Sequence, residues 1–133
     1  MKRFLKGLPL VIVSLFFIVT LAHAQSILTP GTVLEGFALD KKNTNFPMIV
    51  KIVGVDEGSG NFTGEVSWPS LNSVHRIEGR INGHTITFNE VSHIKKGSAH
   101  LHCEYALIID GRSVDGRWVE PGRDRGTVQL KIQ

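Results

Sequence analysis

Three side chains able to bind a metal ion alternate along residues 100–104. His100, His102 and Glu104 are two positions apart, so on a β-strand they would share one face. They could supply part of a zinc site, which needs three or four ligands in a tetrahedral array. The alternate positions 101, 103 and 105 are apolar and are expected to face the interior, which turns the histidines toward solvent. The sequence therefore predicts no metal site and no cofactor.

A catalytic nucleophile is the second kind of chemistry to consider. Cys103 is the only cysteine, and its place in an apolar alternation favours a buried, unreactive thiol; a catalytic thiol or an intermolecular disulfide is the alternative. The sequence has no nucleophile elbow, phosphate-binding glycine loop or clustered metal signature. Its acidic residues fall mostly at turns or outward positions, whereas a paired-carboxylate mechanism needs two acids in one cleft. We predict no enzymatic activity and no catalytic residues.

Aromatic residues give a stronger indication of function. Five of them fall at positions expected to face inward, and these are the predicted ligand-binding residues: Phe62, Trp68, Phe88, Tyr105 and Trp118. The interior of an eight-stranded barrel can be just filled by side chains, or it can hold one small ligand. The sequence therefore predicts binding of a small apolar ligand inside a barrel, with a fully packed aromatic core as the alternative.

The segments that must position these aromatics alternate with a period of two between turn signals, which indicates β-strands. No helical period is visible between Gln25 and Gln133. Eight strands are predicted, at residues 32–39, 48–55, 61–68, 74–81, 84–88, 98–109 and 113–118, with the last through Val128, Leu130 and Ile132. Asn82-Gly83 and Asp110-Gly111 are predicted to form tight hairpin turns, because both positions of such a turn favour residues that tolerate positive φ.

Short connections make consecutive strands pair antiparallel. The predicted fold class is therefore all-β, with an eight-stranded antiparallel meander that closes as a small barrel. Closure removes unpaired strand edges, and an even number of strands lets the first and the last meet antiparallel. A two-sheet β-sandwich is the alternative.

Short glycine and aromatic motifs resemble those of the calycin group, which comprises lipocalin, fatty-acid-binding and avidin-like barrels. Gly36 and Phe37, within residues 34–37, lie where a lipocalin carries Gly-x-Trp on its first strand. Residues 60–65 are similar to the glycine-rich third strand of avidin-like barrels, and residues 117–119, around Trp118, are similar to their penultimate tryptophan strand. The resemblance implies a small up-and-down barrel and carries over no particular ligand.

The first 24 residues predict an exported protein. A basic start is followed by an apolar run and by Ala22-His23-Ala24, which is the layout of a cleaved secretory signal peptide. The predicted division is a signal peptide at residues 1–24 and one β-barrel domain at residues 25–133, located in the periplasm or outside the cell. A membrane anchor is the alternative, but the apolar run is short for a spanning helix, which needs about 20 residues. We expect no membrane span after cleavage.

The charge balance gives no indication of nucleic-acid binding. The chain has 15 Lys and Arg residues against 12 Asp and Glu residues. Three of the basic residues and none of the acidic residues lie in the predicted signal peptide, so twelve of each remain in the mature domain. Its formal net charge of zero offers no electrostatic footprint for a polyanion.

A protein-binding module is the alternative function. A small exported barrel could act as a periplasmic hydrolase inhibitor through its N-terminus or a loop, a hypothesis that rests on architecture and location. The candidate segments are residues 25–28 and the loop 121–126. Ile27 and Leu28 could equally pack under the barrel as a plug.

Overall fold

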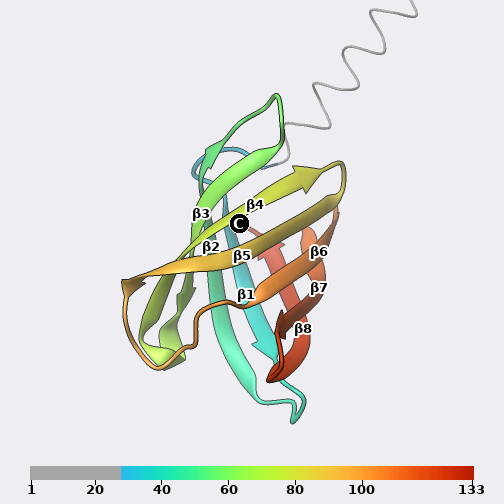
Figure 1. Cartoon of the computed structure of the whole chain (residues 1–133). Helices are drawn as coiled ribbons and strands as arrows, with labels where there is room; N and C mark the ends of the chain where they lie inside the picture. Colours follow the sequence, from blue (N-terminus) through green and yellow to red (C-terminus); the bar gives the residue numbers. More distant parts are fainter. Residues whose placement is uncertain (1–27) are drawn as a thin grey trace, which may run out of the picture.

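A computed structural model describes residues 28–133, and these form one closed β-barrel (Figure 1). Its eight strands are β1 (Val33–Leu39), β2 (Asn45–Val55), β3 (Asn61–Trp68), β4 (Ser73–Asn82), β5 (Thr85–Lys95), β6 (Glu104–Asp110), β7 (Ser113–Glu120) and β8 (Asp124–Ile132). A 3-10 turn, η1 (Pro69–Leu71), follows β3. Each strand pairs antiparallel with the next. The all-β class and the antiparallel meander are confirmed.

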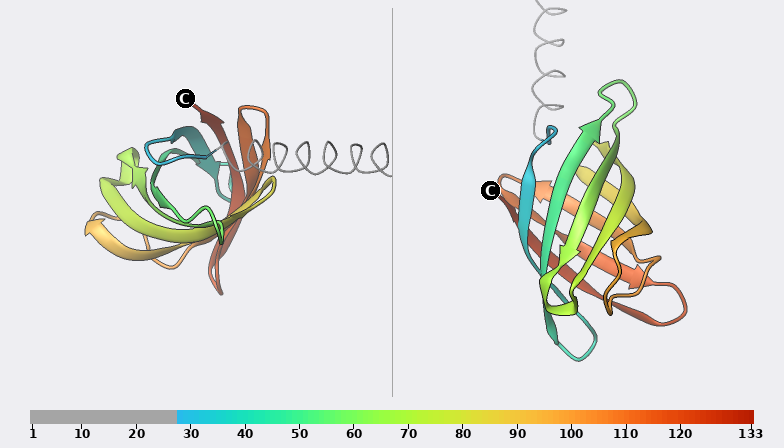
Figure 2. Two further views of the ribbon diagram at one scale, coloured as in Figure 1. Left: turned by 90° about the horizontal axis from the view of Figure 1, so that it is seen from above. Right: turned by 90° about the vertical axis from the view of Figure 1, so that its left-hand side faces the viewer.

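Pairing of the first strand with the last closes the barrel. Leu34 lies opposite Ile132 and Ala38 lies opposite Val128, so β1 has β2 on one side and β8 on the other. The ring of strands is visible end-on in the left view of Figure 2. This pairing excludes the two-sheet sandwich and is consistent with the barrel architecture of the calycin group.

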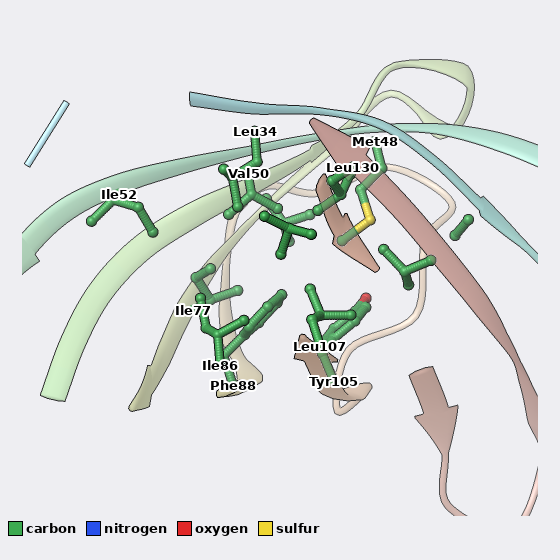
Figure 3. Close-up of a cluster of buried hydrophobic side chains, with 14 of the residues drawn as sticks. Leu34, Met48, Val50, Ile52, Ile77, Ile86, Phe88, Tyr105, Leu107 and Leu130 are labelled. Atoms are coloured by element: carbon green, nitrogen blue, oxygen red, sulfur yellow. The ribbon is translucent and has the colours of Figure 1, made fainter. Parts of the chain in front are cut away.

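Alternating side chains fill the interior. Along β6, Tyr105, Leu107 and Ile109 are buried while the residues between them are exposed. Figure 3 shows such side chains meeting across the barrel; those with almost no exposed surface include Leu34, Met48, Val50, Ile52, Val66, Ile77, Ile86, Leu107, Val114 and Leu130. Full burial of an aliphatic side chain contributes about 1.5–3 kcal/mol. This core holds the fold together without a disulfide, since Cys103 is unpaired.

Two glycines allow close backbone approach where the barrel closes. A Cβ on Gly36 of β1 would collide with the carbonyl oxygen of Gln129 on β8. A Cβ on Gly126 of β8 would collide with the carbonyl oxygen of Leu39 on β1. Only glycine fits at such points, which is its usual role inside a tightly coiled strand.

The connection between β5 and β6 differs from the prediction. The fifth strand, expected at 84–88, extends to Lys95, and the sixth, expected from residue 98, begins at Glu104. His102 has a φ of 73°, a left-handed conformation that interrupts an extended chain. His100 and His102 therefore lie on a connecting segment and not on one strand face, although both are exposed as expected.

This connecting segment, residues 96–103, is hydrogen-bonded to η1 and to the start of β4. The Ser98 N–H donates to the carbonyl oxygen of Leu71 at 3.0 Å, and the Ala99 N–H donates to Ser73 Oγ at 3.0 Å. Backbone groups that a continuous sixth strand would have paired are satisfied instead by η1 and β4.

The two ends of the barrel differ. In a meander alternate turns fall at the same end, so residues 40–44, η1, residues 96–103 and residues 121–123 gather at one end, which we call the open end (lower end in the right view of Figure 2). At the other end Leu28 is 2% exposed and belongs to the hydrophobic core, although it precedes β1. Within residues 28–133 no helix is long and apolar enough to cross a membrane.

Candidate ligand-binding site

A cavity of about 390 Å³ lies at the open end. Trp68, Tyr105 and Trp118 supply aromatic wall, and Phe46 and Leu71 add apolar surface. Polar lining residues come from several strands and turns: Asp40, Glu90, His100, Cys103, Glu120, Arg123 and Asp124. A mainly apolar wall with a few polar groups, at a volume within about 300–1,000 Å³, is typical of small-molecule sites.

Hydrogen bonds fix both indole rings in the cavity wall. Trp68 ends β3, and its Nε1–H donates to Glu90 Oε2 at 3.0 Å. Trp118 lies on β7, and its Nε1–H donates to the carbonyl oxygen of Leu39 at 3.0 Å. Because a buried Trp whose N–H is bonded keeps one ring orientation, the aromatic wall is set before any ligand arrives.

The side chain of Glu90 is the most deeply buried acid of this wall. Glu90 is 2% exposed and lies on β5, where alternation from Ile86 and Phe88 directs it inward. His75 on β4 is fully buried by the same alternation with Ile77, and its Nδ1 lies 3.0 Å from Glu90 Oε2. Two ring nitrogens, from Trp68 and His75, therefore meet one carboxyl oxygen.

The other carboxyl oxygen has no protein partner. Glu90 Oε1 is buried without a hydrogen bond, and so is His75 Nε2. When His75 carries a proton on Nδ1, Oε2 of the Glu90 carboxylate receives two donors and Oε1 is left as an acceptor. An unmet buried acceptor costs about 1–3 kcal/mol, and more when it is charged. The site therefore contains an acceptor that a bound donor would stabilise.

Glu90 also affects its neighbours. Burial, followed by the nearby Glu90 carboxylate, raises the pKa of Tyr105 well above its usual value. Burial, followed by Glu90 and Glu120, also raises the pKa of the Cys103 thiol. Both groups stay protonated at neutral pH, and Cys103 lacks the low pKa of a nucleophilic thiol. This supports the interpretation of Cys103 as a buried, unreactive residue.

The rim of the cavity is predominantly acidic. Asp40 caps its own turn, and the Thr44 N–H at 2.9 Å is the main cause that lowers the pKa of its carboxyl group. Glu120 contacts His100 Nδ1 at 3.0 Å, and Arg123 at 3.8 Å. The lining thus contains four carboxylates and one permanently charged cation, so its electrostatic potential would attract a positively charged ligand.

Three of the five predicted ligand-binding aromatics come together in this cavity: Trp68, Tyr105 and Trp118. Phe88 packs in the core between Tyr105 and Phe62. Its ring is stacked on that of Tyr105, with 4.4 Å between ring centroids, and lies edge-on to that of Phe62 at 6.1 Å. Phe62 borders a separate hollow near the β2–β3 turn, beside Asp56. The alternative of a packed core describes Phe62 and Phe88, while the other three form the wall of an opening.

A second hollow of about 810 Å³ shares Asp40, Tyr105 and Trp118 with the cavity. Most of its other lining residues, such as Thr87, Asn89 and Arg117, are exposed on the outer face of the sheet, and it does not border Glu90. The smaller cavity is therefore the better candidate for a selective site.

Sequence reasoning missed Glu90 and His75. Both continue an inward alternation, Glu90 after Phe88 and His75 before Ile77, and that pattern was available in the sequence. An acid and a histidine at inward positions of neighbouring strands predict a buried pair, because such residues are rarely buried without partners.

The histidines do not assemble into a metal centre in the part of the chain that is described. No group of three or more His, Cys, Asp or Glu side chains there could hold a metal ion. His75 instead packs edge-on against His93, with ring centroids 4.9 Å apart. Desolvation is the main cause that lowers the pKa of His93, followed by the neighbouring His75.

The segments considered for protein binding are only partly described. Residues 1–24, the predicted signal peptide, and residues 25–27 lie outside the described range, while Leu28 packs into the core as the plug hypothesis expects. The predicted loop 121–126 shortens to a turn of residues 121–123 between β7 and β8, and this turn is exposed.

Comparison of the chain with protein-family models, with curated proteins and with solved structures found no significant match.

Proposed function

We propose that the chain is an exported, non-enzymatic binding protein that holds a small, mainly apolar molecule in the cavity at the open end of its barrel. The observation that carries this proposal is the aromatic cavity of about 390 Å³ formed by Trp68, Tyr105 and Trp118. The ligand would lie at the mouth, because side chains fill the barrel beneath it.

Rigidity of the wall supports the proposal. Both indoles are held by hydrogen bonds, to Glu90 and to the Leu39 carbonyl oxygen, and Tyr105 is stacked on Phe88. A site that is ordered before binding loses little conformational entropy when the ligand arrives. The raised pKa of Cys103 fits a role in binding better than a role in catalysis.

The test is a fluorescence titration of the purified mature protein with N-phenyl-1-naphthylamine, a neutral apolar dye. We expect saturable binding with one site per chain. Trp118→Ala removes cavity wall from a half-buried position and should weaken binding at least tenfold. Ile108→Ser is the matched control, because Ile108 is 63% exposed on the outside of β6 and would matter only if the dye adsorbed to the surface.

Folding of each variant is checked first by circular dichroism. Dye affinity unchanged in Trp118→Ala, or lowered equally in Ile108→Ser, would overturn the proposed site. A linear, non-saturable signal from the unaltered protein would do the same.

A further inference from the structure

The unpartnered oxygen of Glu90 identifies a chemical class of ligand for this cavity. We propose that the ligand carries a primary or secondary ammonium group on an apolar body, and that an N–H of this group donates to Glu90 Oε1. The inference rests on the proposed function, and it adds the charge and the donor that the aromatic wall alone does not specify.

The first argument is the incomplete hydrogen bonding of the buried Glu90 side chain. Glu90 borders the cavity and is 2% exposed, and its Oε2 is occupied by Trp68 Nε1 and His75 Nδ1 at 3.0 Å each. Oε1 has no hydrogen-bond partner within residues 28–133, although the Tyr105 hydroxyl and the Cys103 thiol lie near the Glu90 carboxyl group. Hydrogen bonds to a charged acceptor are about twice as strong as neutral ones, so a charged N–H donor gains most from this position.

The second argument is the charge of the cavity wall. Asp40, Glu120 and Asp124 add three carboxylates to that of Glu90, and Arg123 is the one lining residue with a permanent positive charge. Arg123 lies 3.8 Å from Glu120, and Lys41, beside the cavity, lies 3.9 Å from Asp124, so both cations are already paired. An anionic ligand would therefore meet an acidic wall, whereas a cation would be attracted.

The third argument is that aromatic side chains lie next to Glu90. Indole and phenol faces attract ammonium groups within about 6 Å of the ring centroid, most strongly where water is excluded. Trp68, whose indole N–H is bonded to Glu90, and Tyr105, whose pKa rises partly because of Glu90, both border the same cavity. A cation in this cavity would thus have aromatic side chains as well as carboxylates among its neighbours.

The experiment displaces N-phenyl-1-naphthylamine from the unaltered protein with three probes of similar size: 2-phenylethylamine, 2-phenylethanol and phenylacetate. At neutral pH they carry a positive charge, no charge and a negative charge. We expect the amine to compete at least tenfold better than the alcohol, which corresponds to about 1.4 kcal/mol. The carboxylate should be the weakest of the three.

A fourth probe separates charge from hydrogen bonding without altering the protein. The trimethylammonium derivative of 2-phenylethylamine keeps the positive charge but has no N–H. It should lose most of the advantage of the amine. Equal affinity for the two cations would place recognition on the ring faces and overturn the role of Oε1.

Glu90→Gln tests the residue itself. This variant keeps the size of the side chain and removes its charge, so the ratio of amine to alcohol affinity should fall to the small preference that Asp40, Glu120 and Asp124 alone would give. Glu104→Gln is the matched control, because Glu104 is exposed and does not border the cavity; its ratio should equal that of the unaltered protein. A ratio that survives Glu90→Gln would overturn the inference.

The outcomes distinguish this inference from the proposed function. Dye binding with equal competition by amine and alcohol would overturn the ammonium ligand and leave the cavity as a binding site in which Oε1 takes no part. Absence of saturable dye binding would overturn the cavity itself. If Glu90→Gln fails to fold, the four-probe comparison on the unaltered protein still decides the matter.

Discussion

At the scale of single residues, the most consequential feature is the buried pair of His75 and Glu90. Burial of charged or strongly polar groups costs free energy that their mutual contact only partly recovers. The pair therefore contributes little net stability, while removal of one member leaves the other buried and unpaired. A buried pair with this cost is easier to understand if it serves a binding site, and Glu90 does border the proposed cavity.

A double-mutant cycle tests whether the two side chains act as a unit. His75→Phe should lower the free energy of unfolding by about 3 kcal/mol or more, because it strands the Glu90 carboxylate in the core. The double variant His75→Phe with Glu90→Leu should be more stable than that single variant, because the stranded charge has gone. Urea denaturation measures the free energy of unfolding of these two variants and of Glu90→Leu alone, and strictly additive losses would show that the residues are independent.

The thiol of Cys103 gives a prediction with a defined pH dependence. Its folded-state pKa lies above the unfolded value of 9.0, so the folded chain keeps this proton to higher pH. Unfolding then releases a proton above about pH 9, and the contribution of Cys103 to stability falls as pH rises there. Iodoacetamide should modify the native protein slowly at pH 7–9 and the urea-unfolded protein much faster. Fast native alkylation would contradict a buried thiol.

At the scale of elements, closure between β1 and β8 depends on glycine. Gly36→Ala would drive a methyl group against the backbone carbonyl of Gln129, where no flexible side chain can move aside. We expect a loss of about 1–3 kcal/mol or more, the usual cost of overpacking a core. Gly58→Ala is the control, since its new Cβ would make an ordinary contact with Asp56 at 3.5 Å. Thermal unfolding followed by circular dichroism compares the two, and equal melting temperatures would contradict this account of the seam.

Sequence patterns predicted the existence of the strands better than the residues at which they begin and end. The period of two located all eight strands, because buried inward-facing residues alternate with more exposed outward-facing residues along nearly every strand. The same period failed between β5 and β6, where apolar residues at 101 and 103 continue the pattern although the chain turns at His102. A left-handed φ at a histidine leaves no trace in hydrophobicity, so the pattern predicted residues 98–103 as strand although they belong to the connection.

The candidate site was predicted in part for the same reason. Alternation placed Trp68, Tyr105 and Trp118 inward, but it could not distinguish a residue at the mouth from one in the packed centre, such as Phe88. That distinction depends on how far along the barrel axis each residue lies, which follows from register across all the strands. Contacts between distant residues, such as Trp118 with the Leu39 carbonyl oxygen, have no local signal.

At the scale of the whole molecule, the closed ring implies cooperative unfolding. Every strand has two neighbours, so loss of any one strand exposes two edges and opens the core. The last strand is therefore as necessary as a central one. Fluorescence of Trp68 and Trp118, which reports the open end, and far-ultraviolet circular dichroism, which reports the whole sheet, should give coincident urea transitions.

A pair of variants in β8 turns this into a quantitative prediction. Leu130 is buried opposite Gly36 of β1 and Val114 of β7, and Leu130→Ala should lower the free energy of unfolding by about 2–5 kcal/mol, because it leaves a cavity at the seam. Both optical transitions should shift by the same amount, although the tryptophans lie on other strands. The neighbouring Gln129→Ala, at an exposed position of the same strand, should change stability by no more than about 0.5 kcal/mol. A circular dichroism transition that shifts while the fluorescence transition stays in place would mean that the open end folds independently of barrel closure.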